Sequence, residues 1–251
     1  MSKSAILIMM CLLMSSVGYS QMSYDFKTQE LKEIKSGRTL AGEMELKSGE
    51  ILKGNLRVPG MMNKAILLKE FPSAKEQKIK AETIKELRVY SREGQEPFVM
   101  IFINASEYRP LKTKIGVNTL GLKNAAMTDV KLKVYKKYAW MQQLIKGKAS
   151  LYVYGQTYGV SNGSMIASVK GTREQFPTLP YYAKMEGRDS IPVLVHAEGT
   201  GGGNMYFKEC MPLFFYGDPI ADKIRNKEEG YKNGKDGELY KIFNEYNARN
   251  E

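Results

Sequence analysis

The sequence predicts an α+β protein that is mainly β, with a small N-terminal β-barrel or sandwich, a second β-rich region and a C-terminal helical cap. Residues 39–206 contain short segments in which apolar and polar residues alternate, and turn residues separate these segments at short intervals. This pattern is typical of barrels and sandwiches. Beyond residue 206 the apolar residues instead repeat at the spacing of a helix.

The first twenty residues have the features of a secretory signal peptide. Lys3 precedes an apolar run at 5–14, and two small residues, Gly18 and Ser20, stand shortly before Gln21. We expect cleavage after Ser20 and export to the periplasm, the periphery of the outer membrane or the medium. The apolar run is too short for a membrane-spanning helix, which needs about 20 apolar residues, and no later segment comes close. We therefore expect no transmembrane segment in the mature chain.

Cysteine and histidine are too scarce for a disulfide or a transition-metal site. Cys11 lies within the apolar run and does not follow small residues, so we expect no lipid anchor there, and its loss leaves Cys210 as the only cysteine. The one histidine, His196, cannot complete a zinc, copper or iron site with a single cysteine. No calcium-binding D-x-[DN]-x-[DN]-G loop is present. We expect neither a metal nor another cofactor.

Residues 21–38 predict an N-terminal arm or a short amphipathic helix, and a β-rich domain is expected over 39–115. The clearest element is the segment Gly42–Val58, in which the alternation of apolar and polar residues breaks at Ser48-Gly49. This segment predicts a β-hairpin. Further strands are predicted at 65–70, 87–90 and 98–103, with one helical turn at 82–86.

A second β-rich region is expected over 125–206. Its predicted strands are 131–135, 150–158, 165–169, 181–185 and 191–196. Between the first two of them, Tyr138, Met141 and Leu144 share a face at helical spacing, so a helix is predicted over 137–146, with Gly147 as its end.

Residues 207–251 predict helices that pack on the preceding sheet. The glycine run Gly199–Gly203 predicts a flexible linker rather than a phosphate site, because it matches neither the P-loop nor the dinucleotide-binding template. Asp218 and Pro219 provide an N-cap and a first-turn proline for a helix that runs through Arg225. The residues that mark the apolar helix faces are Phe207, Cys210, Met211, Phe214, Leu239, Ile242, Phe243 and Tyr246. We expect Cys210 to be a core residue.

Three stretches of the chain carry a family resemblance. GEMELKSGEILKGNLRV at 42–58, QLIKGKASLYVY at 143–154, and the segment 218–247 with its Ile-Arg-Asn-Lys-Glu core and closing Glu-Tyr-Asn resemble uncharacterised exported β-rich proteins of Bacteroidota-type Gram-negative bacteria. The resemblance implies an envelope or secreted protein with a β-rich body and a helical C-terminus. It implies no activity, cofactor or catalytic residue.

One motif is compatible with catalysis. Residues 159–163 match the nucleophile-elbow pattern G-x-S-x-G around Ser161, and Asp189 and His196 follow in the order used by α/β-hydrolases. His196 would take the Ser161 proton, and Asp189 would orient the imidazole. However, no alternation of strands and helices precedes the motif, and Asn162-Gly163 is well suited to the tight turn of a hairpin. A serine esterase-like hydrolase is therefore the alternative hypothesis.

The stretch 130–173 differs from the rest of the chain in charge. It contains eight lysine or arginine residues, no aspartate or glutamate, five tyrosines and the only tryptophan. Lysines attract phosphates and uronates, and aromatic rings stack on sugar rings or lie at a lipid interface. The predicted binding residues are Lys131, Lys133, Lys136, Lys137, Trp140, Lys146, Lys148 and Tyr152. The competing interpretation is that the tyrosines fill one face of a sheet while the lysines solvate the other.

We therefore expect a non-catalytic exported protein that binds an anionic envelope component or a partner protein through this basic, tyrosine-rich surface. The formal net charge of +11 favours anionic partners. For an exported protein these are lipid, lipopolysaccharide phosphate or acidic polysaccharide rather than nucleic acid. A third hypothesis is a structural or assembly subunit of the envelope that uses the helical tail as its contact surface.

Overall fold

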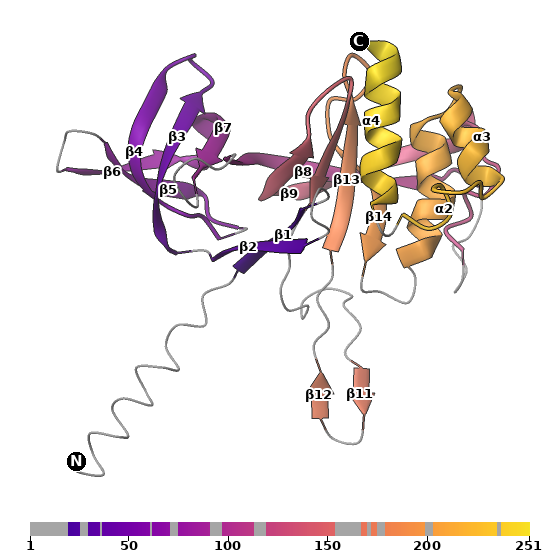
Figure 1. The fold of residues 1–251 in the computed structure, drawn as a ribbon, viewed down its shortest axis with the longest axis horizontal. Coiled ribbons are helices and arrows are strands. Elements are labelled where there is room, and N and C mark those ends of the chain that lie inside the picture. The colour runs from indigo at the N-terminus through magenta and orange to yellow at the C-terminus, as the bar shows by residue number, and fades with distance from the viewer. Residues whose placement is uncertain are drawn as a thin grey trace.

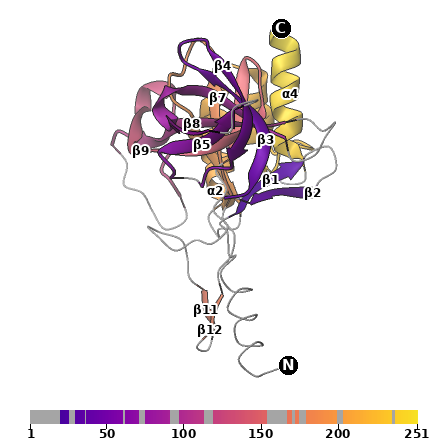
Figure 2. The same ribbon diagram turned by 90° about the vertical axis from the view of Figure 1, so that its left-hand side faces the viewer.

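Strands dominate the computed structural model of the chain, with 48% of the residues in strands and 22% in helices. The structure describes residues 20–25, 30–35, 37–60, 62–70, 75–90, 97–112, 119–153, 167–169, 172–174, 179–198, 203–234 and 237–251. It combines a five-stranded barrel, further strands and C-terminal helices (Figures 1 and 2). The predicted fold class, mainly β with a helical cap, is therefore confirmed.

Ten strands form one continuous sheet in the order β14-β13-β10-β9-β8-β7-β3-β4-β5-β6. They are β3 Thr39–Leu46, β4 Ile51–Arg57, β5 Ala65–Glu70, β6 Glu76–Lys80, β7 Ile84–Val89, β8 Phe98–Pro110, β9 Val130–Ile145, β10 Ala149–Val153, β13 Leu179–Met185 and β14 Val193–Glu198. Two hairpins have their own pairing, β1 Ser20–Asp25 with β2 Glu30–Lys35, and β11 Ala167–Val169 with β12 Thr172–Glu174.

The sheet closes on itself in its second half. β14 returns to β8 through a parallel bridge between Val193 and Ser106. The Ser106 backbone N–H donates to the Pro192 carbonyl at 2.8 Å, and the buried Ser106 hydroxyl donates to the same carbonyl at 3.0 Å. Strands β8, β9, β10, β13 and β14 thus form a closed ring of five strands.

Strands β3 to β7 and the first half of β8 form what we call the N-terminal module, which encloses its own apolar core. The predicted hairpin at 42–58 is confirmed as β3 and β4, which pair from Thr39 with Arg57 to Glu45 with Ile51. Gly49 turns this hairpin with a φ of +92°, a backbone conformation that favours glycine. The buried core residues are Met44, Leu52, Leu56, Val58, Ile66, Leu68, Ala81, Ile84, Leu87, Val89, Phe98, Met100 and Trp140.

The ring and three helices form the C-terminal module. The helices are α2 Gly203–Phe214, α3 Pro219–Arg225 and α4 Glu238–Asn250, and they cover one face of the ring (Figure 1). The Asp218 carboxylate accepts a hydrogen bond from the Ile220 N–H at 2.9 Å, which confirms the predicted cap of α3. Cys210 is buried in the same core, as predicted, and burial raises the pKa of its thiol.

Two buried polar side chains connect the helices to the rest of the module. Glu209 in α2 accepts hydrogen bonds from the Leu120 N–H at 3.1 Å, the Leu122 N–H at 2.8 Å and the Thr119 hydroxyl at 2.9 Å. Asn247 in α4 accepts from the Ala149 N–H at 2.7 Å and donates to the Ala149 carbonyl at 3.0 Å. Asn247 therefore satisfies both polar groups of a fully buried strand residue, as a neighbouring strand would do.

The predicted helix over 137–146 is wrong, because these residues belong to β9. β9 pairs with β8 from Val130 to Gln143. Trp140 enters the core of the N-terminal module, and its neighbour Met141 enters a separate buried cluster that includes Tyr182. A strand buried on both faces is apolar at consecutive positions, so its residues also fit helical spacing. Gly147 lies in the turn between β9 and β10 rather than at a helix end.

Charged side chains form a chain of ion pairs across β3, β7 and the turn after β9. Arg88 donates to Glu43 at 2.8 Å and lies 2.5 Å from Glu86, while Lys53 lies 3.2 Å from Glu43. Lys146 reaches Glu86 from the other module at 3.5 Å. The hydrogen bond from Arg88 is the main cause of the lowered pKa of Glu43.

Replacing Asn247 by alanine should destabilise the chain, because it leaves the N–H and C=O of Ala149 buried without a partner. We expect the free energy of unfolding to fall by about 2–3 kcal/mol, from roughly 1–3 kcal/mol for each unsatisfied buried group. Urea titration followed by circular dichroism measures this change. Asn244→Ala, one turn earlier in α4, removes no hydrogen bond that the described residues make and should change stability by less than about 0.5 kcal/mol.

Stability should also fall in acid through Glu43. Because its pKa is lower in the folded chain than its ordinary value of 4.5, ionised Glu43 stabilises the fold at higher pH, and this contribution is lost as the pH falls through the folded pKa. We expect Glu43→Gln to flatten part of the decline in urea midpoint between about pH 5 and about pH 3. Glu50→Gln, at an exposed position of the same hairpin, should leave the decline intact. Identical profiles for wild type and Glu43→Gln would contradict the assignment.

Candidate functional site

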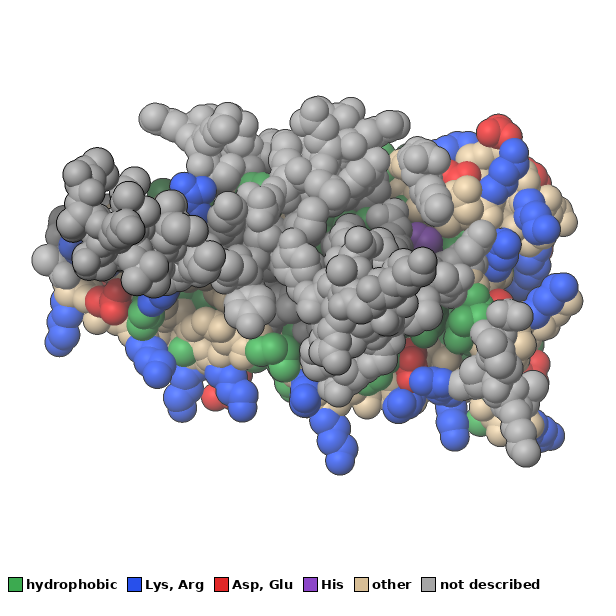
Figure 3. Space-filling model, turned by 90° about the horizontal axis from the view of Figure 1, so that it is seen from below, with side chains coloured by type: hydrophobic (Ala, Val, Ile, Leu, Met, Phe, Trp, Pro, Cys, Tyr) green, Lys and Arg blue, Asp and Glu red, His purple; other side chains and the backbone are tan. Residues whose placement is uncertain are grey.

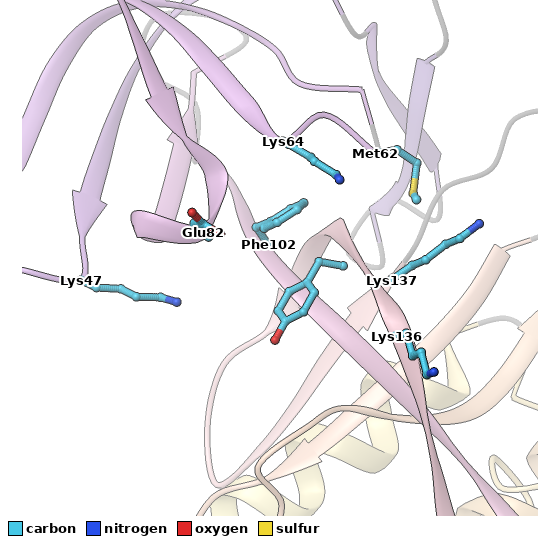
Figure 4. A pocket seen from close by; sticks show the side chains of 8 residues that line it. Lys47, Met62, Lys64, Glu82, Phe102, Lys136 and Lys137 are labelled. Atoms are coloured by element: carbon cyan, nitrogen blue, oxygen red, sulfur yellow. The ribbon is translucent and has the colours of Figure 1, made fainter.

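A groove of about 650 Å³ lies where the N-terminal module meets β8 and β9. Four segments that are distant in sequence contribute to it: the β3–β4 turn, the loop before β5, the 3₁₀ turn Ala81–Thr83, and the paired strands β8 and β9. The described residues that line it are Lys47, Met62, Lys64, Glu82, Phe102, Lys136, Lys137 and Tyr138 (Figure 4). This groove is the candidate site.

Two stacked aromatic rings form the apolar part of the groove. The rings of Phe102 and Tyr138 lie 5.7 Å apart between centroids, with an angle of 30° between their planes. The ring of Trp140 lies behind them in the core, 5.3 Å from that of Phe102. Tyr138 is 50% exposed, so one aromatic surface is held rigidly by its neighbours and remains open to a ligand.

Four lysines surround these rings. Lys47 and Lys64 have fixed backbones, because the Lys47 N–H donates to Thr83 and the Lys64 carbonyl accepts from Ala81. Figure 4 shows Lys136 and Lys137 on one side of Phe102, with Lys47 and Glu82 on the other. The backbones are thus held in place while the charged ends of the side chains stay in solvent.

The groove lysines form no ion pairs with the described carboxylates, unlike several lysines elsewhere in the chain. Within the described residues, no carboxylate lies within 4 Å of the ammonium groups of Lys47, Lys64, Lys136 or Lys137. Glu82 is the one acidic residue among the described residues of the lining, and it forms no ion pair with them. The groove therefore presents a concentrated positive potential over an apolar surface.

The structure brings together only part of the predicted binding surface. Lys136 and Lys137 line the groove, whereas Lys131 and Lys133 lie farther along β9, and Lys133 is 3.3 Å from Glu107. Lys146 and Lys148 lie in the turn after β9 and belong to structural ion pairs, with Glu86 at 3.5 Å and with Glu186 at 3.0 Å.

Trp140 and Tyr152 are not available for contact with a ligand. Trp140 is fully buried, and its indole N–H donates to the Asn63 carbonyl at 2.9 Å. Tyr152 is buried in the cluster with Tyr182, and its hydroxyl accepts a hydrogen bond from Gln143 at 3.4 Å. Both residues contribute to the core because strands β9 and β10 are covered on both faces at these positions.

The structure does not bring together the acid and base proposed for a hydrolase. Asp189 accepts a hydrogen bond from the Met185 N–H at 2.8 Å, in the turn between β13 and β14. His196 pairs with Tyr181, four residues away from Met185 along β13, which corresponds to about 13 Å at the rise of a strand. The imidazole is buried and stacks on the Tyr181 ring with centroids 5.6 Å apart. Ser161 lies outside the described residues.

The helical tail belongs to the core. Phe207, Phe214 and Phe243 are buried against the strands of the ring, so the apolar faces of α2 and α4 are already covered. A subunit that used this tail as a free docking element would leave such a face exposed.

Among the described residues, no three His, Cys, Asp or Glu side chains are placed to hold a metal ion. In the same part of the chain, no helix has both the length and the apolar character needed to cross a bilayer.

Six of the groove residues were not predicted as binding residues, namely Lys47, Met62, Lys64, Glu82, Phe102 and Tyr138. Lys47, Met62 and Lys64 precede β9 by more than 60 residues, and Phe102 resembles any other apolar residue of a buried strand. Nothing in their local sequence distinguishes them. The signal that the sequence did offer was the carboxylate-free stretch 130–173, which led to Lys136 and Lys137 and also contains Tyr138.

The burial of Trp140 has a direct spectroscopic consequence, since it is the only tryptophan. We expect its emission in the folded protein to resist quenching by acrylamide and to stay unchanged when an anionic polymer is added. In urea the same emission should become easily quenched. Strong quenching of the folded protein would contradict the burial of Trp140, and protection by the polymer would place Trp140 in contact with the ligand.

No family model, no curated protein and no solved structure matches the chain. The chemistry of the groove is therefore the basis for a functional assignment.

Proposed function

We propose that this is a non-catalytic exported protein that binds an acidic polysaccharide of the cell envelope in the groove. The observation that carries the proposal is the set of four lysines around the stacked pair of Phe102 and Tyr138, none of which pairs with a carboxylate of the described residues. A ligand that combines negative charge with a flat apolar ring face complements both features. An acidic sugar polymer has this combination in every charged unit.

The lysine charges and the exposed ring of Tyr138 contribute to binding in different ways. Lysine charges attract an anionic polymer from a distance, and this attraction weakens as salt screens it. The exposed ring of Tyr138 then offers a rigid surface on which a sugar ring can stack. Because Phe102 already orders this ring, little side-chain entropy is lost when a ligand binds.

The lysines of β9 beyond the groove support an extended ligand. Figure 3 shows basic side chains projecting along one long edge of the molecule, with hydrophobic and a few acidic side chains between them. The lysine-rich first half of β9 continues directly from the groove. A polymer longer than the groove would therefore meet further positive charge on its way out.

The predicted signal peptide and the net charge of +11 agree with a ligand outside the cytoplasm. Acidic polysaccharide and lipopolysaccharide phosphate are abundant anions of that compartment. Export is a separate hypothesis within this proposal. Cleavage of the chain between Ser20 and Gln21 would support it.

Replacing three groove lysines should weaken binding and its dependence on salt. For Lys64→Gln/Lys136→Gln/Lys137→Gln we expect roughly tenfold weaker binding to an alginate oligomer, from about 0.5 kcal/mol for each exposed charge pair. Isothermal titration at several salt concentrations measures both effects. Tyr138→Ala should weaken binding without changing the salt dependence, because it removes stacking but no charge.

A matched control separates the groove from net charge. Lys69→Gln/Lys78→Gln/Lys208→Gln removes the same charge from exposed positions outside the groove and should leave the affinity within about twofold. Neutral dextran should not bind. Equal losses for the two triple variants would show that the attraction is non-specific, and no binding of any acidic polymer would refute the proposal.

A further inference from the structure

Exposed apolar residues gather along β9. Of the seven large hydrophobic side chains that are exposed within the described residues, Met62 and Tyr138 belong to the groove, and three others belong to the far end of the β8–β9 pair. These three are Leu111 at 52% exposure, Leu132 at 49% and Val134 at 46%. We call residues 109–112 and 128–134 the ribbon tip.

The pairing of the two strands places Leu132 and Val134 on one side of the sheet. Tyr108 stands opposite Leu132 and Ser106 opposite Val134, and side chains two residues apart in a strand point the same way. The Leu111 N–H donates to the Asp129 carbonyl at 2.9 Å, so Leu111 is opposite Asp129 and belongs to the other side of the strand pair. Isolated exposed apolar residues need no explanation, but Leu132 and Val134 form a small apolar surface on one face of the tip.

A polar hollow of about 390 Å³ adjoins these residues. Its described lining includes the tip residues Pro110, Leu111, Lys112, Thr128 and Asp129 and the neighbouring residues Gly121, Lys123, Asn124 and Ala125. Asp129 is the one carboxylate among them, and it accepts a hydrogen bond from the Ala126 N–H at 3.0 Å. Two lysines and a hydroxyl thus face a space large enough for a phosphate group.

The charges around the tip are predominantly basic. Glu107 is the buried carboxylate of this region, and both Arg109 and Lys133 pair with it. Within the described residues, Lys112, Lys123 and Lys131 have no carboxylate within 4 Å. The tip therefore combines a small apolar surface, a polar hollow and lysines that pair with no carboxylate of the described residues.

We propose that the ribbon tip docks on a bilayer that contains anionic phospholipid. Lys112 and Lys123 take a lipid phosphate in the hollow, and Leu132 and Val134 enter the boundary between headgroups and acyl chains. Charge complementarity favours this occupant, because each lysine near an anionic membrane contributes about 1 kcal/mol. A stable protein interface would instead need about 800 Å² on each partner and buried aromatic anchors, which these aliphatic side chains do not provide.

The ribbon tip lies outside the groove, although a polymer longer than the groove would pass along the same half of β9, and the proposal does not depend on polysaccharide binding. The test is co-sedimentation of the mature chain with two kinds of vesicle. One contains phosphatidylcholine alone, and in the other about one lipid in three is the anionic phosphatidylglycerol. We expect binding only to the anionic vesicles. Leu132→Thr/Val134→Thr places polar, β-branched residues that suit a strand at these exposed positions, and Lys112→Gln/Lys123→Gln removes the headgroup contacts.

Each of these double variants should bind anionic vesicles roughly tenfold more weakly, while both keep full affinity for the alginate oligomer. Lys69→Gln/Lys208→Gln is the control for net charge and should bind vesicles as the unmodified chain does. Thermal melts of all variants verify that they fold. Failure of the unmodified chain to bind anionic vesicles would overturn the proposal, as would unchanged binding of Leu132→Thr/Val134→Thr.

Discussion

The antiparallel pairing of β8 with β9 is the interaction on which both halves of the fold depend. The strands have 13 and 16 residues and pair from Val99 with Gln143 to Pro110 with Val130. One end of this pair supplies Trp140 to the core of the N-terminal module, and the other supplies Tyr108 to the core under the helices. Neither module can therefore keep its core if the pairing is lost, and the groove between them exists only because both are built on the same two strands.

β9 changes its surroundings along its length, and this change locates the binding surfaces. Ala139, Trp140 and Met141 are buried at consecutive positions, whereas residues 131–138 are exposed except for the half-buried Tyr135. Side chains of a strand segment that is exposed on both faces do not pack in a core, so packing does not restrict which residues occupy these positions. Lysines, two aliphatic residues and Tyr138 occupy these positions, and the stretch from 130 to 173 contains no carboxylate that could neutralise them.

The sequence was informative where the signal is local and silent where it is not. The turn at Ser48-Gly49 and the Asp218-Pro219 cap identify their elements by short-range chemistry, and both were predicted correctly. Strand β9 was mistaken in part for a helix, because burial on both faces removes the two-residue period. The contact of Asn247 with Ala149 and the approach of Lys64 to Lys136 arise from tertiary structure alone, and no spacing in the chain encodes them. For the same reason Trp140 and Tyr152 looked like ligand contacts, although their type in a strand equally fits a core.

The groove lysines form no ion pair with the described residues that would stabilise the fold, and this supports a role in binding. Their like charges repel one another, while Glu43 and Glu86 bind arginine and lysine elsewhere in the same module. Proteins retain arrangements that cost stability chiefly where function requires them. An anion in the groove would offset the repulsion and, because it binds only the folded chain, would shift the equilibrium toward that state. The backbone bonds at Lys47 and Lys64 fix the positions of two of these charges in advance, so the ligand need not order the loops that present them.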